Sequence, residues 1–436
     1  MRHMKRNPRE IVLAAALFAG VHVLASACSS ADSGQPTQPT DVTVYEGARL
    51  IVGDGRAPIE DSVFVVEDGR FTQVGARGQV QVPEDAARVD LAGKTVMPAI
   101  VDTHAHLAGT REALVDQLEH KAYYGAGVVM SLGQDTGDLA FQVRDEVIPD
   151  AARLRTAGRG LTRPEPGRSE APYWVNTEAE ARKAVQELAA RKVDLVKIWV
   201  DDRDGKYEKL TPALYGAVID EAHTQGLRVT AHIFALEDAK GLLRAGLDAF
   251  AHGVRDRDID DEFLALLKEH AQVVLVPNLP SRGVAEDLGW LSETVPADEL
   301  KTLQAAATDR RAAQEAFAIQ ARNLVKMNEA GVRIAFGTDG SAAWAPHGEM
   351  ADMVAAGMTP AQVIVAATRN SAALLQLADS GTVEAGKIAD FLVLDANPLD
   401  DITNTRRIAA VYLRGDAVDR AAQRERRRAS TATATQ

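Results

Sequence analysis

Four histidines and one aspartate stand where short apolar runs end, and their side chains are of the kinds that bind divalent metal ions. His104 and His106 lie in "VDTHAHL", and residues two apart on a strand point to the same face. His232 lies in "VTAHIF", His252 in "AFAHGV" and Asp339 in "AFGTDG". Imidazole and carboxylate ligands together suit a borderline ion such as Zn²⁺. A lone histidine is usually structural, so the prediction of a metal centre depends on the convergence of all five residues.

Lys197 lies at the centre of the apolar run "VDLVKIWVDD", residues 193–202, which predicts a buried strand. A buried ammonium group must find a partner or lose its charge. One interpretation pairs it with Asp194, Asp201 or Asp202. The other uses the lowered pKa of a desolvated lysine, because a neutral amine can add CO₂ and become a carbamate that bridges two cations. Beside four strand-end histidines, we favour the carbamate.

The elements that must position these residues alternate between strand-like and helix-like runs. Helix starts are marked, as at Thr177 with Glu180, which fits a capping box. Eight β/α units predict a (β/α)8 TIM barrel of class α/β over residues 96–380, with its active site at the C-terminal strand ends. The eight candidate strands are 96–102, 127–132, 153–157, 193–200, 228–233, 249–252, 273–276 and 333–337.

Short alternating runs flank the barrel on both sides. Residues 41–95 contain such runs, with Asp68-Gly69 between two of them as a hairpin signal. A similar pattern returns at 381–418. The two segments predict one small discontinuous β-sandwich domain formed from both ends of the chain.

The motifs "HAH", "LVKIWVDD", "TAHIF", "AHGV" and "FGTDG" together resemble the binuclear amidohydrolase superfamily. The resemblance extends from about residue 41 to 418, and "GTVEAGKIADFLVLDANPL" resembles the C-terminal return of that family. Within the superfamily the chain is most similar to the branch with imidazolonepropionase-like and Xaa-Pro dipeptidase (prolidase-like) members.

The resemblance implies a centre of two divalent ions, expected to be Zn²⁺, bridged by a hydroxide and a carboxylated lysine. The hydroxide would attack a substrate carbonyl, and Asp339 would pass its proton to the leaving group. The implied ligands are His104, His106 and Asp339 for one ion, His232 and His252 for the other, and the carbamate of Lys197 between them.

The implied activity is metal-dependent hydrolysis of amide-type C–N bonds in a small molecule, with dipeptides ending in proline as candidate substrates. A lactone or organophosphate ester hydrolase on the same centre is the alternative among enzymes. A deaminase is less favoured, because mononuclear deaminases of the superfamily do not need the lysine on the fourth strand. An inactive lipid-anchored binding protein is the alternative from another class, and a missing metal ligand would indicate it. The sequence leaves the substrate, the metal and the oligomeric state open.

Five further residues near the strand ends are candidates for contacts with the substrate or with the metal ligands. Each could equally be structural. Two of them lie in the longest loop, 158–176. The candidates are Asn278, Arg255, His347, Tyr173 and Trp174.

Residues 1–27 have the pattern of an export signal. A positive segment precedes a short apolar run, 11–24, which is below the ~20 residues of a membrane span. The run ends in "LASAC", which resembles a bacterial lipobox with Cys28 as the lipidated residue; ordinary cleavage after residues 25–27 is the alternative. Residues 28–40 predict a flexible linker. We therefore expect an exported lipoprotein in the periplasm or at the cell surface.

Composition limits the kinds of partner that the protein can bind and the disulfides that it can form. The net charge of −13 argues against nucleic acid as a partner. A single cysteine excludes an intramolecular disulfide. Hydrophobic residues make up 46% of the chain, which is enough for a large core. The arginine-rich end, 419–436, predicts a disordered tail.

Overall fold

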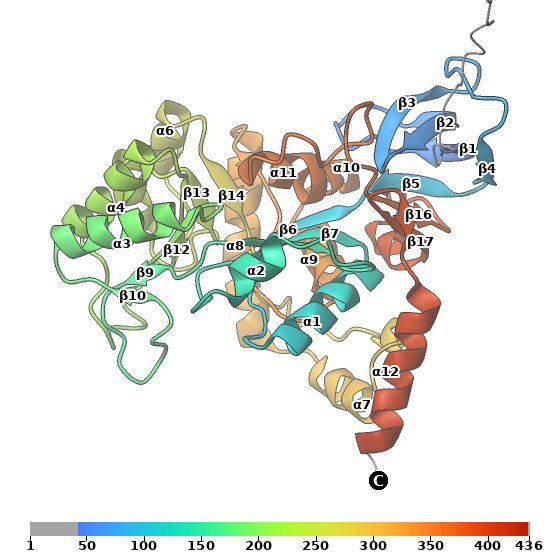
Figure 1. Cartoon of the computed structure of the whole chain (residues 1–436). Helices are drawn as coiled ribbons and strands as arrows, with labels where there is room; N and C mark the ends of the chain where they lie inside the picture. The colour runs from blue at the N-terminus through green and yellow to red at the C-terminus, as the bar shows by residue number, and fades with distance from the viewer. Residues whose placement is uncertain (1–41, 435–436) are drawn as a thin grey trace, which may run out of the picture. The chain divides into compact units, whose positions relative to one another are not determined.

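Eight parallel strands, buried along nearly their whole length, form the barrel that the sequence predicts (Figure 1). The computed structural model describes residues 42–434. Backbone hydrogen bonds join the first and last strand regions, since Asp339 N donates to His104 O at 2.7 Å. The barrel strands are β6 (Ile100–Ala105), β7 (Ala126–Ser131), β8 (Arg153–Thr156), β11 (Val196–Val200), β12 (Val229–Ile233), β13 (Ala249–Ala251), β14 (Val274–Val276) and β15 (Arg333–Ile334).

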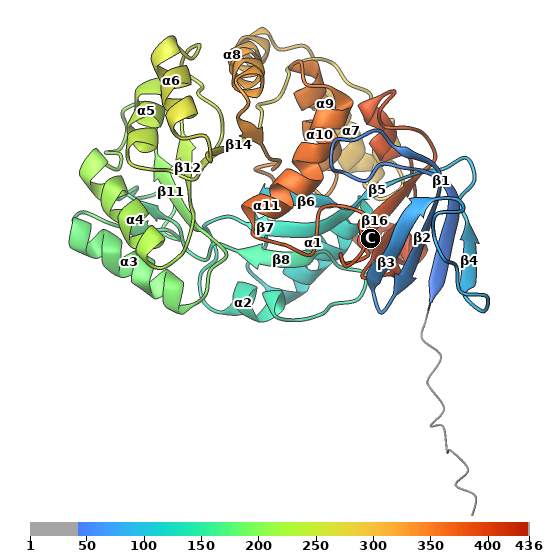
Figure 2. The same cartoon turned by 90° about the horizontal axis from the view of Figure 1, so that it is seen from above.

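Helices cover the outside of the barrel (Figure 2). Thr177 and Glu180 form the predicted capping box at the start of α3. The long loop 158–176 contains two short parallel strands, β9 (Leu161–Thr162) and β10 (Tyr173–Trp174), and β9 pairs with β11 of the barrel. The helices are α1 (Arg111–Tyr123), α2 (Leu139–Arg144), α3 (Glu178–Ala190), α4 (Pro212–Thr224), α5 (Leu236–Arg244), α6 (Asp261–Glu269), η1 (Gly289–Leu291), α7 (Ala297–Ala306), α8 (Arg311–Glu329), α9 (Ala345–Ala355), α10 (Pro360–Val365), η2 (Ala366–Asn370), α11 (Ser371–Leu374) and η3 (Ile402–Arg406).

Strands from both ends of the chain form one mixed sheet beside the barrel, as the sequence predicts. The predicted sandwich is a single hydrogen-bonded sheet of eight strands that bends, so that the rings of Phe64 and Phe391 meet with centroids 5.3 Å apart. Asp68 and Gly69, both at positive φ, make the predicted hairpin turn. The strands are β1 (Thr43–Leu50), β2 (Ile59–Glu67), β3 (Arg70–Ala76), β4 (Ala87–Asp90), β5 (Thr95–Pro98), β16 (Phe391–Leu394), β17 (Ile408–Leu413) and β18 (Asp416–Ala417).

The predicted first barrel strand, 96–102, is in fact parts of two strands with different partners. Met97 in β5 pairs with Leu392 in β16 and belongs to the mixed sheet. Ile100 N donates to Gly125 O and begins the barrel. The domain boundary predicted at residue 95 therefore falls inside β5, because the apolar run continues while its pairing partner changes.

The predicted disordered tail is wrong over most of its length, because helix α12 (Arg420–Ala434) occupies it. Arg424 pairs with Glu293 at 3.5 Å and Arg426 pairs with Glu119 of α1 at 2.7 Å. Arg420 Nε donates to the carbonyl of Tyr123. The helix lacks an apolar stripe and is held by these polar contacts. The sequence therefore shows no hydrophobic periodicity from which the helix could be predicted.

The leader, Cys28 and the linker 28–40 lie outside the described residues, so their predictions remain predictions. Within residues 42–434, none of the helices combines the length and the apolar character that a membrane span requires.

Candidate metal centre

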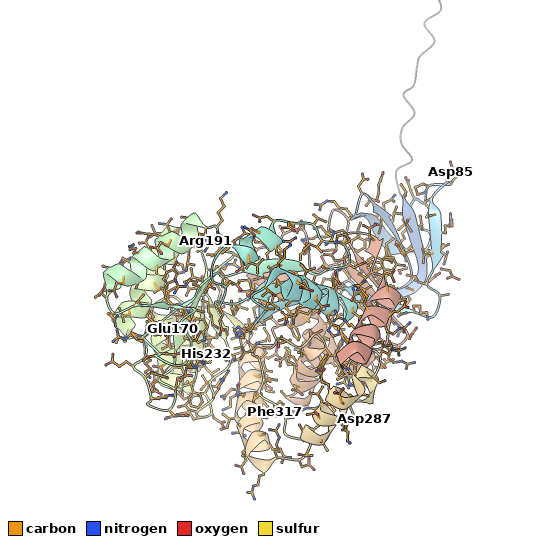
Figure 3. The ribbon with its side chains drawn as sticks, turned by 60° about the horizontal axis from the view of Figure 1, so that its bottom comes forward. Asp85, Glu170, Arg191, His232, Asp287 and Phe317 are labelled. Atoms are coloured by element: carbon orange, nitrogen blue, oxygen red, sulfur yellow. The ribbon has the colours of Figure 1, made fainter. Side chains whose placement is uncertain are left out.

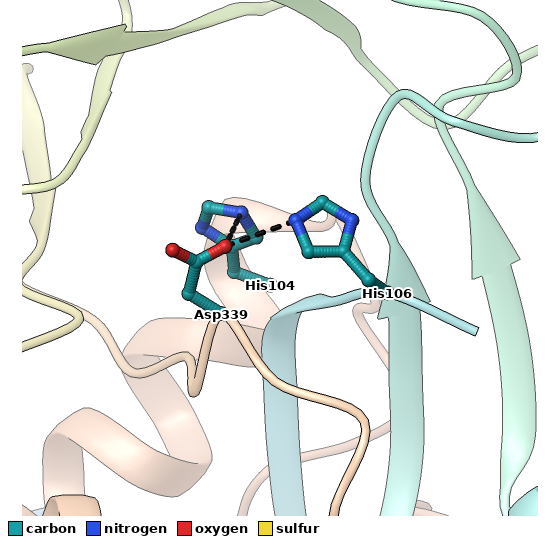
Figure 4. A group of neighbouring side chains, drawn as sticks. All are labelled: His104, His106 and Asp339. Carbon is teal, nitrogen blue, oxygen red and sulfur yellow. Dashed lines mark hydrogen bonds and ion pairs between the residues drawn. The ribbon is translucent and has the colours of Figure 1, made fainter. Parts of the chain in front are cut away.

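His104, His106 and Asp339 meet at the C-terminal ends of the first and last barrel strands, and we call them the first ligand group (Figure 4). Nε2 of His104 lies 3.0 Å from Oδ1 of Asp339, and Nε2 of His106 lies 2.9 Å from the same oxygen. The three donor atoms lie within 4.8 Å of one another, so they could hold one metal ion. His104 is buried, whereas the side chains of His106 and Asp339 are 30% and 38% exposed and face solvent.

The charge states of this group suit a metal ion. Burial raises the pKa of Asp339, but hydrogen bonds from His104 and His106 and the charges of nearby histidines outweigh burial and hold it well below its usual range. Burial, followed by the charge of Lys197, lowers the pKa of His104 to about 4. Metal ligands must be deprotonated, and an ionised Asp339 beside the neutral imidazole of His104 meets that requirement.

Lys197, His232 and His252 come from the neighbouring strands β11 and β12 and from the residue after β13, and we call them the second ligand group. The rings of His232 (labelled in Figure 3) and His252 have centroids 4.6 Å apart. The rings of His252 and His104 are 5.2 Å apart, which brings the two ligand groups together at one end of the barrel.

Lys197 has no acidic partner among the described residues. Its Nζ is buried and makes no hydrogen bond to any other described residue. Asp194 instead accepts a hydrogen bond from Thr156 N at 2.8 Å, and Asp201 pairs with Arg203 at 2.6 Å. The interpretation as a lysine–acid pair is therefore wrong.

The surroundings of Lys197 favour its neutral amine. Burial, assisted by the charges of Arg255 and Arg203 and opposed by Asp339, lowers the pKa of Lys197 to about 7. Gly133 makes room for its stem, since a Cβ there would lie 2.8 Å from Cγ of the lysine. The amine that carboxylation requires is thus present near neutral pH, while the carbamate itself remains a prediction.

The two histidines of the second ligand group are also neutral. Nε2 of His232 lies 2.9 Å from Asp201 Oδ2, and an Nε2–H donated there leaves Nδ1 with its lone pair. Both ring nitrogens of His252 are buried without a hydrogen-bond partner in the described chain. Burial is the main cause that lowers the pKa of His232 to about 3 and that of His252 well below its usual value.

Asp102 supports the first ligand group, and the sequence did not single it out. Its Oδ1 accepts from the backbone N–H of His104 at 3.2 Å and of Thr338 at 3.1 Å. Its Oδ2 accepts from Thr338 Oγ1 at 2.8 Å and lies 3.5 Å from the buried Nζ of Lys121. The available signal was an aspartate directly on the strand that carries "HAH".

Asn278 contacts the candidate metal ligand His104, which is one of the two kinds of contact predicted for it. Its Oδ1 lies 3.0 Å from Nδ1 of His104, and once a metal ion is bound it would accept the proton of Nδ1 and leave Nε2 of that ring for the ion. The next residue, Leu279, donates its backbone N–H to both oxygens of the buried Glu349 at 3.1 Å. Glu349 therefore fixes the turn that carries Asn278, which is held at φ 43°.

Arg255 follows β13 and is tied to the end of β12, since its backbone N–H donates to Phe234 O at 2.9 Å. Its charge is among the causes that lower the pKa of Lys197, His232 and His252. This places it beside the second ligand group.

His347 is a packing residue, so its predicted role at the site is wrong. Its Nδ1 bonds Thr405 Oγ1 and its Nε2 bonds the carbonyl of Tyr124, both at 3.0 Å. Both nitrogens are used in the interior, where the ring packs among aromatic side chains.

Tyr173 and Trp174 sit on the loop strand β10. The guanidinium of Arg159 stacks 4.1 Å from the ring centroid of Tyr173, and Nε1 of Trp174 is buried without a hydrogen-bond partner among described residues. No hydrogen bond or ring contact joins either residue to the ligand groups in the part of the chain described. Their role as walls of a substrate pocket remains a prediction.

Comparison with known sequences decides the family. The profile of the Amidohydrolase family matches residues 95–418, which include all six candidate ligands. The chain belongs to the Amidohydrolase family. As a member with a candidate metal site at its barrel rim, it is a metal-dependent hydrolase.

Individual relatives agree with this family. An uncharacterized protein of Mycobacterium tuberculosis (strain H37Rv) is 32% identical over 295 residues, which cover 63% of this chain and 73% of the relative. Imidazolonepropionase of Deinococcus radiodurans is 27% identical over 392 residues, covering 82% of this chain and 92% of that enzyme.

Solved structures share the fold. A candidate prolidase from Bifidobacterium longum matches with a TM-score of 0.73 at 26% identity, over 90% of this chain and 99% of the other. Phenylurea hydrolase B matches with a TM-score of 0.72 at 23% identity, over 87% and 97% of the two chains. The predicted family, its likeness to imidazolonepropionase and prolidases, and the TIM barrel are confirmed.

Proposed function

We propose that this protein hydrolyses amide-type C–N bonds in small molecules with two divalent ions, expected to be Zn²⁺. The observation that carries the proposal is the second ligand group, where Lys197 Nζ and both nitrogens of His252 are buried with no hydrogen-bond partner in the described chain. A buried polar atom without a partner destabilises a fold by about 1–3 kcal/mol. A metal ion and a carbamate would satisfy these atoms.

In this proposal, the two ligand groups hold the ions and Asp339 transfers the proton. The first ligand group would hold one ion and the second the other; when bound, the ions polarise the scissile carbonyl and lower the pKa of the attacking water. Asp339, whose side chain is 38% exposed, faces the side from which a substrate arrives. It takes up the proton of the attacking water and delivers it to the leaving amine.

Dipeptides ending in proline are the first substrates to test. The likeness to a candidate prolidase and to imidazolonepropionase supports a substrate whose C–N bond is adjacent to a carbonyl or lies in a ring. Both classes require the same attack on a carbonyl carbon.

The decisive experiment combines metal analysis of the purified protein with a substrate panel. We expect about two metal ions per chain after growth with zinc, and hydrolysis of dipeptides or N-acyl amino acids in preference to lactones and phosphotriesters. Fewer than two ions would contradict the bridged centre. Hydrolysis of esters alone would replace the proposed activity, and release of ammonia would indicate a deaminase.

We also infer that the protein is exported and lipid-anchored through Cys28. The support is the sequence "LASAC" after a short apolar run. Growth with labelled palmitate should label the wild type and leave Cys28→Ala unlabelled and released from membranes. Equal labelling of both would contradict the anchor.

A further inference from the structure

Arg255 is a cation without a hydrogen-bond or ion-pair partner in residues 42–434. Its Nε is buried, and no hydrogen bond or ion pair joins its guanidinium to another residue of the described chain. A largely buried guanidinium normally pairs with a carboxylate or phosphate, because its donors are otherwise left without acceptors. The nearby carboxylates are already used: Asp339 by His104 and His106, and Asp201 by Arg203.

A second guanidinium at the same strand end has one N–H group without a hydrogen-bond partner in the described chain. Arg203 donates its Nε to the buried Glu165 at 3.1 Å and its Nη1 to Asp201 at 2.6 Å. Its Nη2 is buried and has no partner among the described residues. These contacts fix the direction of the Arg203 guanidinium and leave one N–H group unused.

Both arginines lie at the end of β12. Nη1 of Arg203 lies 3.0 Å from Nε2 of His232, and the backbone of Arg255 bonds the carbonyl of Phe234, two residues further along the same strand end. The unused donors therefore lie on the side of the second ligand group, at the rim where the substrate binds in the proposed function.

We propose that Arg255 and the free Nη2 of Arg203 bind the carboxylate of the substrate, so that the enzyme prefers dipeptides and N-acyl amino acids to neutral amides, carbamates and ureas. The inference rests on the proposed function and narrows its substrate class. Arg255 is the principal donor, since its whole guanidinium is unpaired and can meet both oxygens of a carboxylate.

Phe234 indicates what accompanies the carboxylate. It is 39% exposed and is one of three large exposed hydrophobic residues in the described chain. Its carbonyl accepts the backbone N–H of Arg255, so the aromatic residue and the cation are neighbours. An apolar group attached near the carboxylate, as in leucine, phenylalanine or proline, fits such a pair.

A carbamate on Lys197 is the alternative anionic partner of Arg255. Kinetic measurements distinguish it from the substrate carboxylate. If Arg255 neutralised the carbamate, its loss would lower activity on every substrate and reduce the metal content. If it binds the substrate carboxylate, its loss affects only substrates that carry one.

The test compares L-leucyl-L-proline with L-leucyl-L-prolinamide, which has the same scissile bond and no carboxylate. In Arg255→Gln we expect KM for the dipeptide to rise about 10- to 100-fold, with kcat and the kinetics of the amide little changed. Arg257→Gln is the matched control, because the side chain of Arg257 is 65% exposed and already pairs with Asp256. Arg203→Lys, which keeps the charge, should raise KM for the dipeptide less.

A binding measurement judges the site without turnover. Calorimetric titration of the metal-loaded protein should show L-proline binding more tightly than L-prolinamide, and Arg255→Gln should abolish the difference. Equal binding of both, or an equal loss for the dipeptide and its amide in Arg255→Gln, would overturn the inference. If the protein cleaves only neutral carbamates or ureas, the carboxylate site is wrong and the C–N hydrolase stands. If it cleaves no C–N bond while the titration still shows the preference, the proposed function is wrong and the carboxylate site stands.

Discussion

The first and second ligand groups bring similar side chains to one end of the barrel, yet their polar atoms are paired to different degrees. In the first, one oxygen of Asp339 lies 3.0 and 2.9 Å from two imidazoles. In the second, Lys197 Nζ and both nitrogens of His252 make no hydrogen bond to any described residue, and the nearest charge contact is 3.6 Å, from His252 Nε2 to Asp339 Oδ2. A paired group keeps its geometry without metal, whereas an unpaired buried group destabilises the fold until ions bind.

The largest effect is expected at the paired group. Asp339→Asn removes a ligand and the group that carries the proton, so kcat should fall about 10⁴-fold. The exposed Asp85 provides a control, and Asp85→Asn should leave kcat unchanged. Steady-state kinetics with the best panel substrate measures both variants. A variant at Asp339 that keeps a tenth of the wild-type rate would contradict the role given to it.

Lys197→Ala tests the unpaired group. Without the bridge, His232 and His252 are two neutral ligands and too few to hold an ion, so the metal content should fall from about two ions to about one. Activity should fall roughly 10³-fold, because a metal ion contributes several kcal/mol to the transition state. Mass spectrometry of bound metal and circular dichroism of the fold check the result.

A matched lysine controls this experiment. Lys183 on α3 is 76% exposed, so Lys183→Ala should keep both ions and full activity. Retention of two ions by Lys197→Ala would remove the difference between the two groups.

Asn278→Ala should loosen the paired group without removing a ligand. Loss of the acceptor for His104 Nδ1–H frees the tautomer of that ring, and the metal affinity should weaken about 10- to 100-fold. Asn278→Asp keeps an acceptor oxygen and should restore most of the affinity. Competition with a chelator measures all three proteins, and an alanine variant that holds metal as tightly as the wild type would show that the contact is only structural.

The smallest effect concerns carbon dioxide and pH. Burial, with Arg255 and Arg203, lowers the pKa of Lys197 to about 7 in the metal-free protein, so the amine is protonated below that pH and neutral above it. Only the neutral amine adds CO₂, so reactivation of metal-free protein by Zn²⁺, with bicarbonate adjusted to hold dissolved CO₂ at one concentration, should speed up about tenfold between pH 6 and 8. A rate that is independent of both bicarbonate and pH would argue against the carbamate.

The metal ligands could be predicted because each stands where a barrel strand ends, and strand ends of a TIM barrel meet at one face. Their charge states required burial to be known. Asp102 and Glu349 were missed, because their roles depend on contacts with Thr338 and Leu279 that no local pattern reveals. His347 was assigned to the site by its loop, but a loop position does not show which way a ring points.

For the fold as well, local sequence patterns predicted some elements, and contacts between distant residues determined the others. Alternation of strand and helix patterns gave the barrel, and matching β patterns at both ends gave the composite sheet. The start of the barrel was misplaced, because β5 and β6 form one apolar run in which only the partner strand changes. Helix α12 was missed because its arginines are stabilised by acids such as Glu119, far away in the sequence.

The order of strands in the mixed sheet has a consequence for biosynthesis. β5 lies between β1 and β16, so the sheet that the first strands begin is completed by strands that follow the entire barrel. β5 is synthesised long before β16. The strand edge of β5 at Met97 therefore stays unpaired until Leu392 of β16 has been synthesised. Such a distant pairing slows folding. A chain that ends before β16 would expose that edge of β5 to other chains. Only a chain that includes β16 can cover it.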